Sequence, residues 1–290
     1  MGEQYYTSKH SDLVYDVGMH KGEDTDYYLK KGFRVIAFEA DPDLVEQCRN
    51  RFEEELKNGK LIVVEGAITE LPPEDAKDKT IRFFKNKNNS VWGTVADDWA
   101  DRNELLGTTN EIIEVPVIDF SAYLKEYGIP HYLKVDIEGM DIVCLMALMH
   151  FEQKPDYISI ESEKISFDKL IEEIRLLMQL GYKRFKAVQQ QGISHQKEPN
   201  PSKEGIYVGH QFSEGSSGLF GADLPSKWKD YKQILDQYKS IFLQYRLFGD
   251  YGKLTRTFAG EFLRRNLQRL LRKPIPGWYD THAKHFSADS

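Results

Sequence analysis

The sequence predicts an α/β protein whose mostly parallel sheet carries helices on both faces. Three observations predict this class. Short apolar runs alternate with helical patterns over residues 1–189, the first run at 13–18 enters a glycine-bearing turn before a helix, and the next run at 34–39 ends in Glu39. A strand, a glycine turn, a helix and an acid closing the next strand form half of a nucleotide-cofactor fold.

Each element follows from its local pattern. Pro42 suits the first turn of a charged helix, and Gly181 suits the C-cap of another. Two runs at 80–85 and 90–95 are expected to form a hairpin around a polar turn, and residues 114–120 lead into a short helix. Strands are expected at 13–18, 34–39, 60–68, 131–137, 156–161 and 183–188, and helices at 24–31, 42–57, 140–149 and 167–180.

The first turn favours S-adenosylmethionine over a dinucleotide. A dinucleotide turn reads G-x-G-x-x-G, whereas this one reads Asp16-x-Gly18-x-His20-x-Gly22. The acids in and after the turn would repel a diphosphate, yet an acid there can hold the ammonium group of a methionine moiety. The alternative is a structural turn with an exposed acidic cap, which explains the acids better than it explains the glycines together with Glu39.

Composition bounds the function. The 290 residues suit one α/β domain with elaborations or a domain plus a small cap, and the net charge of −7 argues against a nucleic-acid binder. Cys48 and Cys144 are expected to be buried thiols. No apolar run has the length of a membrane span and the first residues lack a signal core, so cytoplasmic residence is expected.

Several segments resemble the FkbM-type S-adenosylmethionine-dependent methyltransferases. The most specific is Leu-Lys-Val-Asp-Ile-Glu-Gly at 133–139, and the others lie at 16–22, 38–42, 66–68, 216–225 and 277–283. The resemblance implies a class I methyltransferase (Rossmann-like) fold with a seven-stranded sheet whose last strand, at 276–284, is antiparallel. It also implies methylation of a hydroxyl on a sugar-containing or secondary-metabolite acceptor, such as a glycan or polyketide.

The same comparison divides the chain into a cofactor-binding core (1–189), an acceptor-side cap (190–273) and a last strand with its tail (274–290). Residues 189–223 are polar and glycine-rich, and are expected to be mobile without acceptor and to form one wall of its pocket. An aromatic stripe between 228 and 245 is expected in the core or in a homo-oligomer contact. The basic segment 253–273 is interpreted as a helix packed on the acidic core, with docking to an anionic lipid surface or a phosphorylated acceptor carrier as the alternative.

Site residues are assigned from their places at the carboxyl ends of strands, where ligands bind in such sheets. Glu39 is expected to bind the ribose diol, Asp41 to orient the adenosine side, and Ala67 with Ile68 to flank the adenine. The methionine part is expected to lie among Asp16, Gly18, His20 and Gly22, with help from Thr25 and with Asp136 beside the sulfonium.

Three residues are candidates for aligning or deprotonating the acceptor hydroxyl: Asp136, Glu138 and His210. Glu138 has an alternative role as a charge at a helix N-terminus, and His195 is a second loop histidine. Asp136 and Glu161 would together hold Mg²⁺ if the enzyme used a catechol-type mechanism, which we do not favour. A catalytically silent cofactor-binding module and a nicotinamide oxidoreductase are the remaining alternatives.

Overall fold

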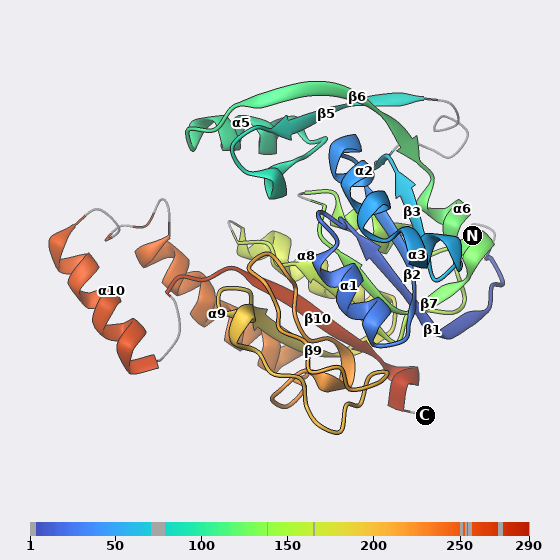
Figure 1. Cartoon of the computed structure of the whole chain (residues 1–290). Coiled ribbons are helices and arrows are strands. Elements are labelled where there is room, and N and C mark those ends of the chain that lie inside the picture. The colour runs from blue at the N-terminus through green and yellow to red at the C-terminus, as the bar shows by residue number, and fades with distance from the viewer. Residues whose placement is uncertain are drawn as a thin grey trace.

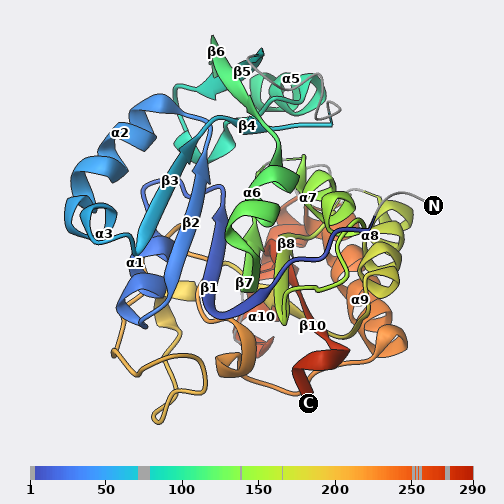
Figure 2. The same ribbon diagram turned by 90° about the vertical axis from the view of Figure 1, so that its right-hand side faces the viewer.

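The computed structural model describes residues 4–70, 79–137, 139–164, 166–249, 252, 254, 257–271 and 275–289. A seven-stranded sheet in the order β3-β2-β1-β7-β8-β10-β9 forms its centre (Figures 1 and 2). The strands are β1 (Lys9–Val17), β2 (Arg34–Glu39), β3 (Leu61–Glu65), β7 (Ile129–Val135), β8 (Tyr157–Glu161), β9 (Tyr182–Gln189) and β10 (Tyr279–His285). β1 pairs in parallel with β2 and β7, whereas β10 runs antiparallel to both β8 and β9. The predicted fold class and its antiparallel last strand are confirmed.

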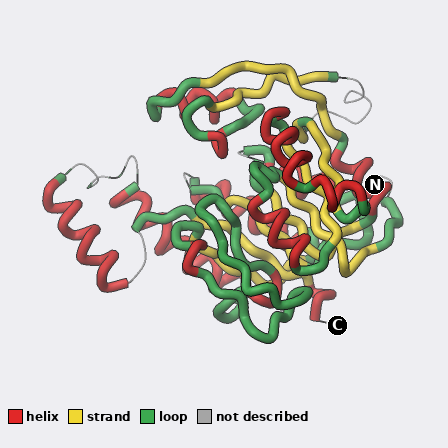
Figure 3. Tube along the Cα trace, in the orientation of Figure 1, coloured by secondary structure: helices red, strands yellow, loops and turns green. Residues whose placement is uncertain are grey.

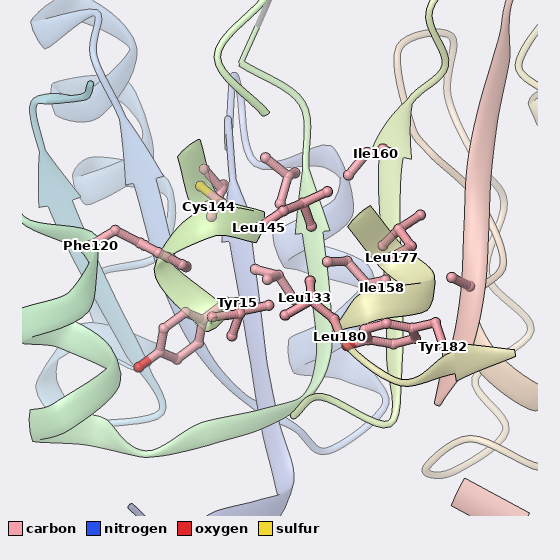
Figure 4. Close-up of a cluster of buried hydrophobic side chains, with 14 of the residues drawn as sticks. Tyr15, Phe120, Leu133, Cys144, Leu145, Ile158, Ile160, Leu177, Leu180 and Tyr182 are labelled. Atoms are coloured by element: carbon pink, nitrogen blue, oxygen red, sulfur yellow. The ribbon is translucent and has the colours of Figure 1, made fainter. Parts of the chain in front are cut away.

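Helices cover both faces of this sheet because strand side chains alternate between the faces. On one face, Tyr15 and Leu133 pack with residues of α6, α7 and α8 (Figure 4), and residues of α9 extend the same cluster. On the other, Val14 and Tyr132 pack with α1, α2 and a long loop. The helices are α1 (Glu23–Lys30), α2 (Pro42–Arg51), α3 (Glu53–Lys57), α5 (Asp97–Leu105), α6 (Phe120–Tyr127), α7 (Asp141–Leu148), α8 (Phe167–Gln179), α9 (Tyr231–Phe248) and α10 (Phe258–Leu271).

Two predicted elements are each divided. The helix expected at 42–57 is interrupted at Phe52, whose φ of −113° and ψ of 34° are not helical and whose ring packs against Gly22. The strand expected at 60–68 is interrupted at Gly66, where φ is 139° and a Cβ would lie 2.5 Å from the Pro116 carbonyl oxygen. Its last two residues, Ala67–Ile68, therefore form β4 in another sheet.

That other sheet has three strands in the order β4-β6-β5 and lies above the carboxyl end of β3 in Figure 1. β5 (Thr80–Asn86) pairs antiparallel with β6 (Asn110–Ile118). The predicted hairpin of 80–85 with 90–95 is therefore wrong, because β5 takes a more distant partner. Ser90–Trp92 is instead the 3-10 helix η1, and one bridge joins Phe84 to Thr94.

The loop after β9 is mostly irregular in backbone (green in Figure 3) but is held by buried side chains. Phe220 stacks on Tyr132 with ring centroids 4.5 Å apart, and Lys31 Nζ donates to Glu198 at 2.6 Å and to Asp223 at 3.0 Å. This packing disagrees with the expectation of a mobile segment, which rested on composition. Glu198 and Asp223 of the loop also accept from the backbone N–H groups of Gly209 and Lys203 within it.

The two late helices differ in their surroundings. The stripe of α9 is buried in the core through Ile234, Tyr238 and Ile241, as one of the two predicted alternatives stated. α10 stands apart from the sheet in Figure 1, and Phe258 and Phe262 are exposed. The interpretation of α10 as a helix packed on the core is therefore wrong. Among the described residues, no helix combines the length and the apolar character needed to cross a bilayer.

Candidate active site

A cavity of about 1290 Å³ opens at the carboxyl ends of the central strands. Gly18 after β1, Glu39 of β2, Asp136 after β7 and Glu161 of β8 all line it. Sites for one small ligand usually have volumes of about 300–1000 Å³. The cavity therefore has room for a cofactor and an acceptor side by side.

The turn after β1 forms one wall of the cavity and depends on glycine. Gly18 has a φ of 83°, and a Cβ there would lie 1.9 Å from the Asp136 carbonyl oxygen. Only glycine combines this left-handed backbone with so close an approach. The turn and the end of β7 therefore meet backbone to backbone, which brings Asp136 beside the turn.

Lys134 is a site residue that the sequence interpretation missed. Its Nζ donates to Asp16 Oδ1 at 3.0 Å and to the Gly18 carbonyl oxygen at 2.7 Å, and it also lines the cavity. Burial alone would lower the pKa of Lys134, but the carboxylates of Asp16 and Asp24 raise it above its ordinary value. Lys134 is therefore charged and supports the turn from below. Its signal in the sequence is a lysine within an apolar strand.

Asp16 and Thr25 lie beneath the turn rather than in the cavity. Both are fully buried, and Thr25 Oγ1 donates to Asp16 Oδ2 at 2.6 Å. Gly22 begins α1 in a left-handed conformation against Phe52. The structure therefore gives these three residues positions that support the turn, where the sequence interpretation expected direct contact with the cofactor.

Glu39 faces the cavity and is partly engaged by backbone. Its Oε2 accepts from His20 N at 2.8 Å and its Oε1 accepts from Asp41 N at 2.9 Å. Burial raises the pKa of Glu39 above its ordinary value, and the two N–H groups oppose that rise. Each carboxylate oxygen has a second lone pair, so the group can still accept two hydroxyl donors.

Asp41 does not line the cavity, although it follows Glu39 closely. It caps α2 by accepting from Asp43 N at 2.9 Å, and Lys85 Nζ donates to it at 2.8 Å. Ala67 and Ile68 do line the cavity, on the side of β4. Of the three residues expected near the adenosine, Ala67 and Ile68 therefore line the cavity. Asp41 instead connects the start of α2 to β5.

His20 joins the turn to the small sheet. It has a φ of 52°, and its Nε2 lies 2.8 Å from Ser90 Oγ while its Nδ1 lies 3.3 Å from Glu23 Oε2. Residues 89–95, which surround Ser90, line the cavity. The sequence interpretation placed His20 in the site but missed Ser90, because the two are 70 residues apart.

The opposite side of the cavity is acidic. Asp280 of β10 lies directly across from Glu161 in the sheet register, and both line the cavity with Asp136. Burial, and then the charges of Asp136 and Glu161, raise the pKa of Asp280 well above its ordinary value. This rise favours the protonated form of Asp280, which can donate a hydrogen bond. Its neighbour Glu161 accepts from Lys164 Nζ at 2.8 Å.

The expected metal pair lines the same cavity. Asp136 and Glu161 end adjacent strands, as predicted. However, no group of three or more His, Cys, Asp or Glu residues is arranged for a metal ion in the part of the chain that the structure describes. Mg²⁺ commonly takes one or two protein carboxylates and keeps several waters, so the presence or absence of Mg²⁺ is decided by chelation and not by this pair of carboxylates.

One of the three candidate bases, His210, lies outside the described lining of the cavity. His210 packs its ring 4.9 Å from that of Tyr27 and 5.0 Å from that of Phe212, outside the cavity lining, and burial lowers its pKa. A base must reach the acceptor hydroxyl, so this position disagrees with the predicted role. Glu138 lies outside the described residues. Asp136 is exposed within the cavity.

A family model described as the methyltransferase FkbM domain matches residues 16–184. Among curated proteins, none matches this chain. Similar solved structures include a precorrin-6y C5,15-methyltransferase from Geobacter metallireducens GS-15, with 13% identity, a TM-score of 0.30 and coverage of 63% of this chain and 70% of that one. Another is the StiE O-MT structure, with 12% identity, a TM-score of 0.36 and coverage of 96% and 70%. A third is the MccD protein, with 11% identity, a TM-score of 0.30 and coverage of 94% and 90%.

Proposed function

The chain belongs to the FkbM methyltransferase family, and from that membership we propose that it transfers the methyl group of S-adenosylmethionine to a hydroxyl of a sugar-containing or secondary-metabolite acceptor. One observation carries this proposal. Glu39 and Asp136 face one cavity from either side of the Gly18 turn, so a ribose-binding acid and a proton-accepting acid are held at the same site. The volume of the cavity supports two ligands.

The residues fit the cofactor from end to end. Glu39 retains free lone pairs for the ribose hydroxyls, and Ala67 with Ile68 offers an apolar surface for the adenine. Gly18 leaves its backbone open to the methionine part. When bound, S-adenosylmethionine supplies an electrophilic methyl group on a sulfonium.

The protein's contribution to transfer is positioning and a place for one proton. The acceptor oxygen must lie in line with the breaking bond, and its proton must leave as the new bond forms. Asp136 is exposed in the cavity beside the turn, so its carboxylate is placed to orient the hydroxyl and accept that proton. Asp280 lines the same cavity, and burial raises its pKa well above its ordinary value, which favours the protonated form that can donate a hydrogen bond to the acceptor.

We propose that this reaction proceeds without Mg²⁺. The observation behind this choice is the ion pair of Glu161 with Lys164, which engages one of the two carboxylates that would hold the metal. A silent cofactor-binding module is disfavoured because Asp136 and Glu39 both remain at the cavity. Such a module needs no acid at the position of transfer.

The test is a methylation assay with methyl-labelled S-adenosylmethionine and a panel of sugars, glycosides and polyketides. Asp136→Asn should lower turnover about a hundredfold or more while the affinity for S-adenosylmethionine changes by less than about threefold. Asp12→Asn, on a carboxylate that pairs with Arg34 on the surface, is the matched control. Parental turnover in Asp136→Asn would overturn the assignment, and loss of activity on chelation that Mg²⁺ restores would replace it with the catechol-type mechanism.

A further inference from the structure

We propose that α10 docks on an anionic lipid surface, so that the protein works at the face of a membrane. This proposal concerns where the protein binds and does not depend on the proposed methyl transfer. It starts from the exposed side chains of α10. Phe258 is 91% exposed, Phe262 is 66% exposed and Leu270 is 78% exposed.

These side chains belong to one side of the helix. Residues 258, 262, 265 and 269 recur at spacings of four and three, and therefore share a stripe. Residues 259, 263, 266 and 270 form the neighbouring stripe by the same rule. Phenylalanine and leucine thus lie beside Arg265 and Arg269 on the exposed side. The opposite side is partly covered, because Gln268 Nε2 donates to the Ile275 carbonyl oxygen at 3.1 Å.

The charge distribution identifies the partner. Residues 253–273 contain seven basic residues and one acid, whereas the rest of the chain contains 32 basic and 45 acidic residues. The one acid, Glu261, accepts from Arg264 at 2.8 Å and from Arg265 at 3.0 Å. The positive charge of this helix, on a protein that is otherwise negative, attracts an anionic partner.

An anionic lipid surface fits both properties of the helix. Interfacial helices bury aromatic and leucine side chains among the headgroups while their basic residues contact lipid phosphates. A second copy of α10 fits less well, because its arginines would meet those of the first. α10 lies apart from the sheet in Figure 1, and its exposed phenylalanine and leucine side chains are accessible to a flat surface.

The experiment is co-sedimentation of the whole protein with vesicles of phosphatidylcholine alone or mixed with phosphatidylserine. We expect binding to the mixed vesicles to be about tenfold stronger or more, and to weaken as salt is added. Arg265→Glu with Arg269→Glu should lower this binding by about tenfold or more. Phe262→Asp with Leu270→Asp should lower it by a similar factor, because the apolar anchor is lost.

The matched control is Arg82→Glu with Leu105→Asp, which changes an exposed arginine and an exposed leucine of the small domain around β5 and α5. It should bind vesicles as the parent does, and all variants should keep the parental affinity for S-adenosylmethionine. Equal binding to both kinds of vesicle, or none, would overturn the proposal. So would a parental dimer that dissociates in the α10 variants without any change in vesicle binding, because the partner would then be a second copy.

Discussion

Lys134 Nζ lies 3.0 Å from Asp16 Oδ1, and both side chains are almost completely buried under the turn that forms the cavity wall. Lys134 reaches the carbonyl oxygen of Gly18 from the same position. β1 and β7 are therefore joined by an ion pair as well as by their ladder. Lys134 and Gly18 both line the cavity. The stability of the core and the shape of the cavity wall therefore depend on the same ion pair.

Lys134→Met should destabilise the protein by about 3–5 kcal/mol, because it leaves the Asp16 carboxylate buried without its cation. Urea unfolding measures this loss. Adding Asp16→Asn should recover part of it, since the uncompensated charge is then removed. Lys57→Met, at a largely exposed pair with Glu53, is the control and should cost about 1 kcal/mol or less. A loss of similar size in both variants would contradict the role of Lys134.

The sequence predicted the elements of the sheet well because their signals are local. The apolar runs of β1 and β2 and the glycine turn between them lie within 30 residues, and their order alone indicates a parallel α/β arrangement. Glu39, Gly18 and Asp136 all line the cavity, and each lies at or directly after the end of a strand.

The contacts and the strand pairing that the sequence did not predict join residues that are distant in sequence. Lys134 and Asp16 are 118 residues apart, and His20 and Ser90 are 70 apart. The pairing of β5 with β6 crosses α5, so a nearby polar turn misled the prediction of a hairpin. His210 was chosen for its chemistry and the composition of its loop, neither of which reports that Tyr27 covers its ring.

His131 should make stability fall at high pH. Burial alone would lower its pKa, but hydrogen bonds to Asp156 at 2.8 Å and Glu204 at 2.7 Å raise the pKa to about 9. Because this folded-state pKa exceeds the unfolded value of about 6.5, the contribution is complete below about pH 6.5 and is lost as the pH rises through about 9.

The variant His131→Gln isolates that contribution. It should lower the free energy of unfolding by about 1.5–3 kcal/mol near pH 6, and the difference from the parent should shrink above about pH 9. Denaturant unfolding at both pH values measures it. His150→Gln, on an exposed ring, is the control. A difference that is the same at both pH values would show that His131 acts through packing alone.

Replacing residues 194–202 by a glycine-serine linker should destabilise the fold. It removes Glu198 and Ser202, which both accept from Lys31 Nζ at 2.6 Å, and leaves Asp223 as the remaining hydrogen-bond acceptor of this buried cation among the described residues. We expect a loss of about 3 kcal/mol, the lower end of the range for a broken buried pair, because one partner remains. Thermal or urea unfolding measures it, and unchanged stability would show that the segment is a dispensable cover.

The same replacement tests the expected acceptor wall. Gln190 and Gln191 and residues 215–217 line the cavity, whereas 194–202 do not. Acceptor turnover per folded molecule should therefore fall much less than the tenfold that a cover over the pocket would produce. Cofactor affinity should be unchanged, because the contacts of Glu39 come from the turn and α2.

Glu39→Ala should weaken S-adenosylmethionine binding about ten- to a hundredfold, because it removes charge-assisted hydrogen bonds worth about 1.5–3 kcal/mol. Calorimetry measures the affinity. Glu65→Ala is a close control, since Glu65 lies directly beside Glu39 in the sheet but pairs with Arg49 at the surface. Burial raises the pKa of Glu39, so the parental affinity should also fall as the pH drops through that raised value, while Glu39→Gln should show little such dependence. If Glu39→Ala binds as tightly as Glu65→Ala, the ribose lies elsewhere, and the direction of the cofactor across the carboxyl ends of β1 and β2 must be reassigned.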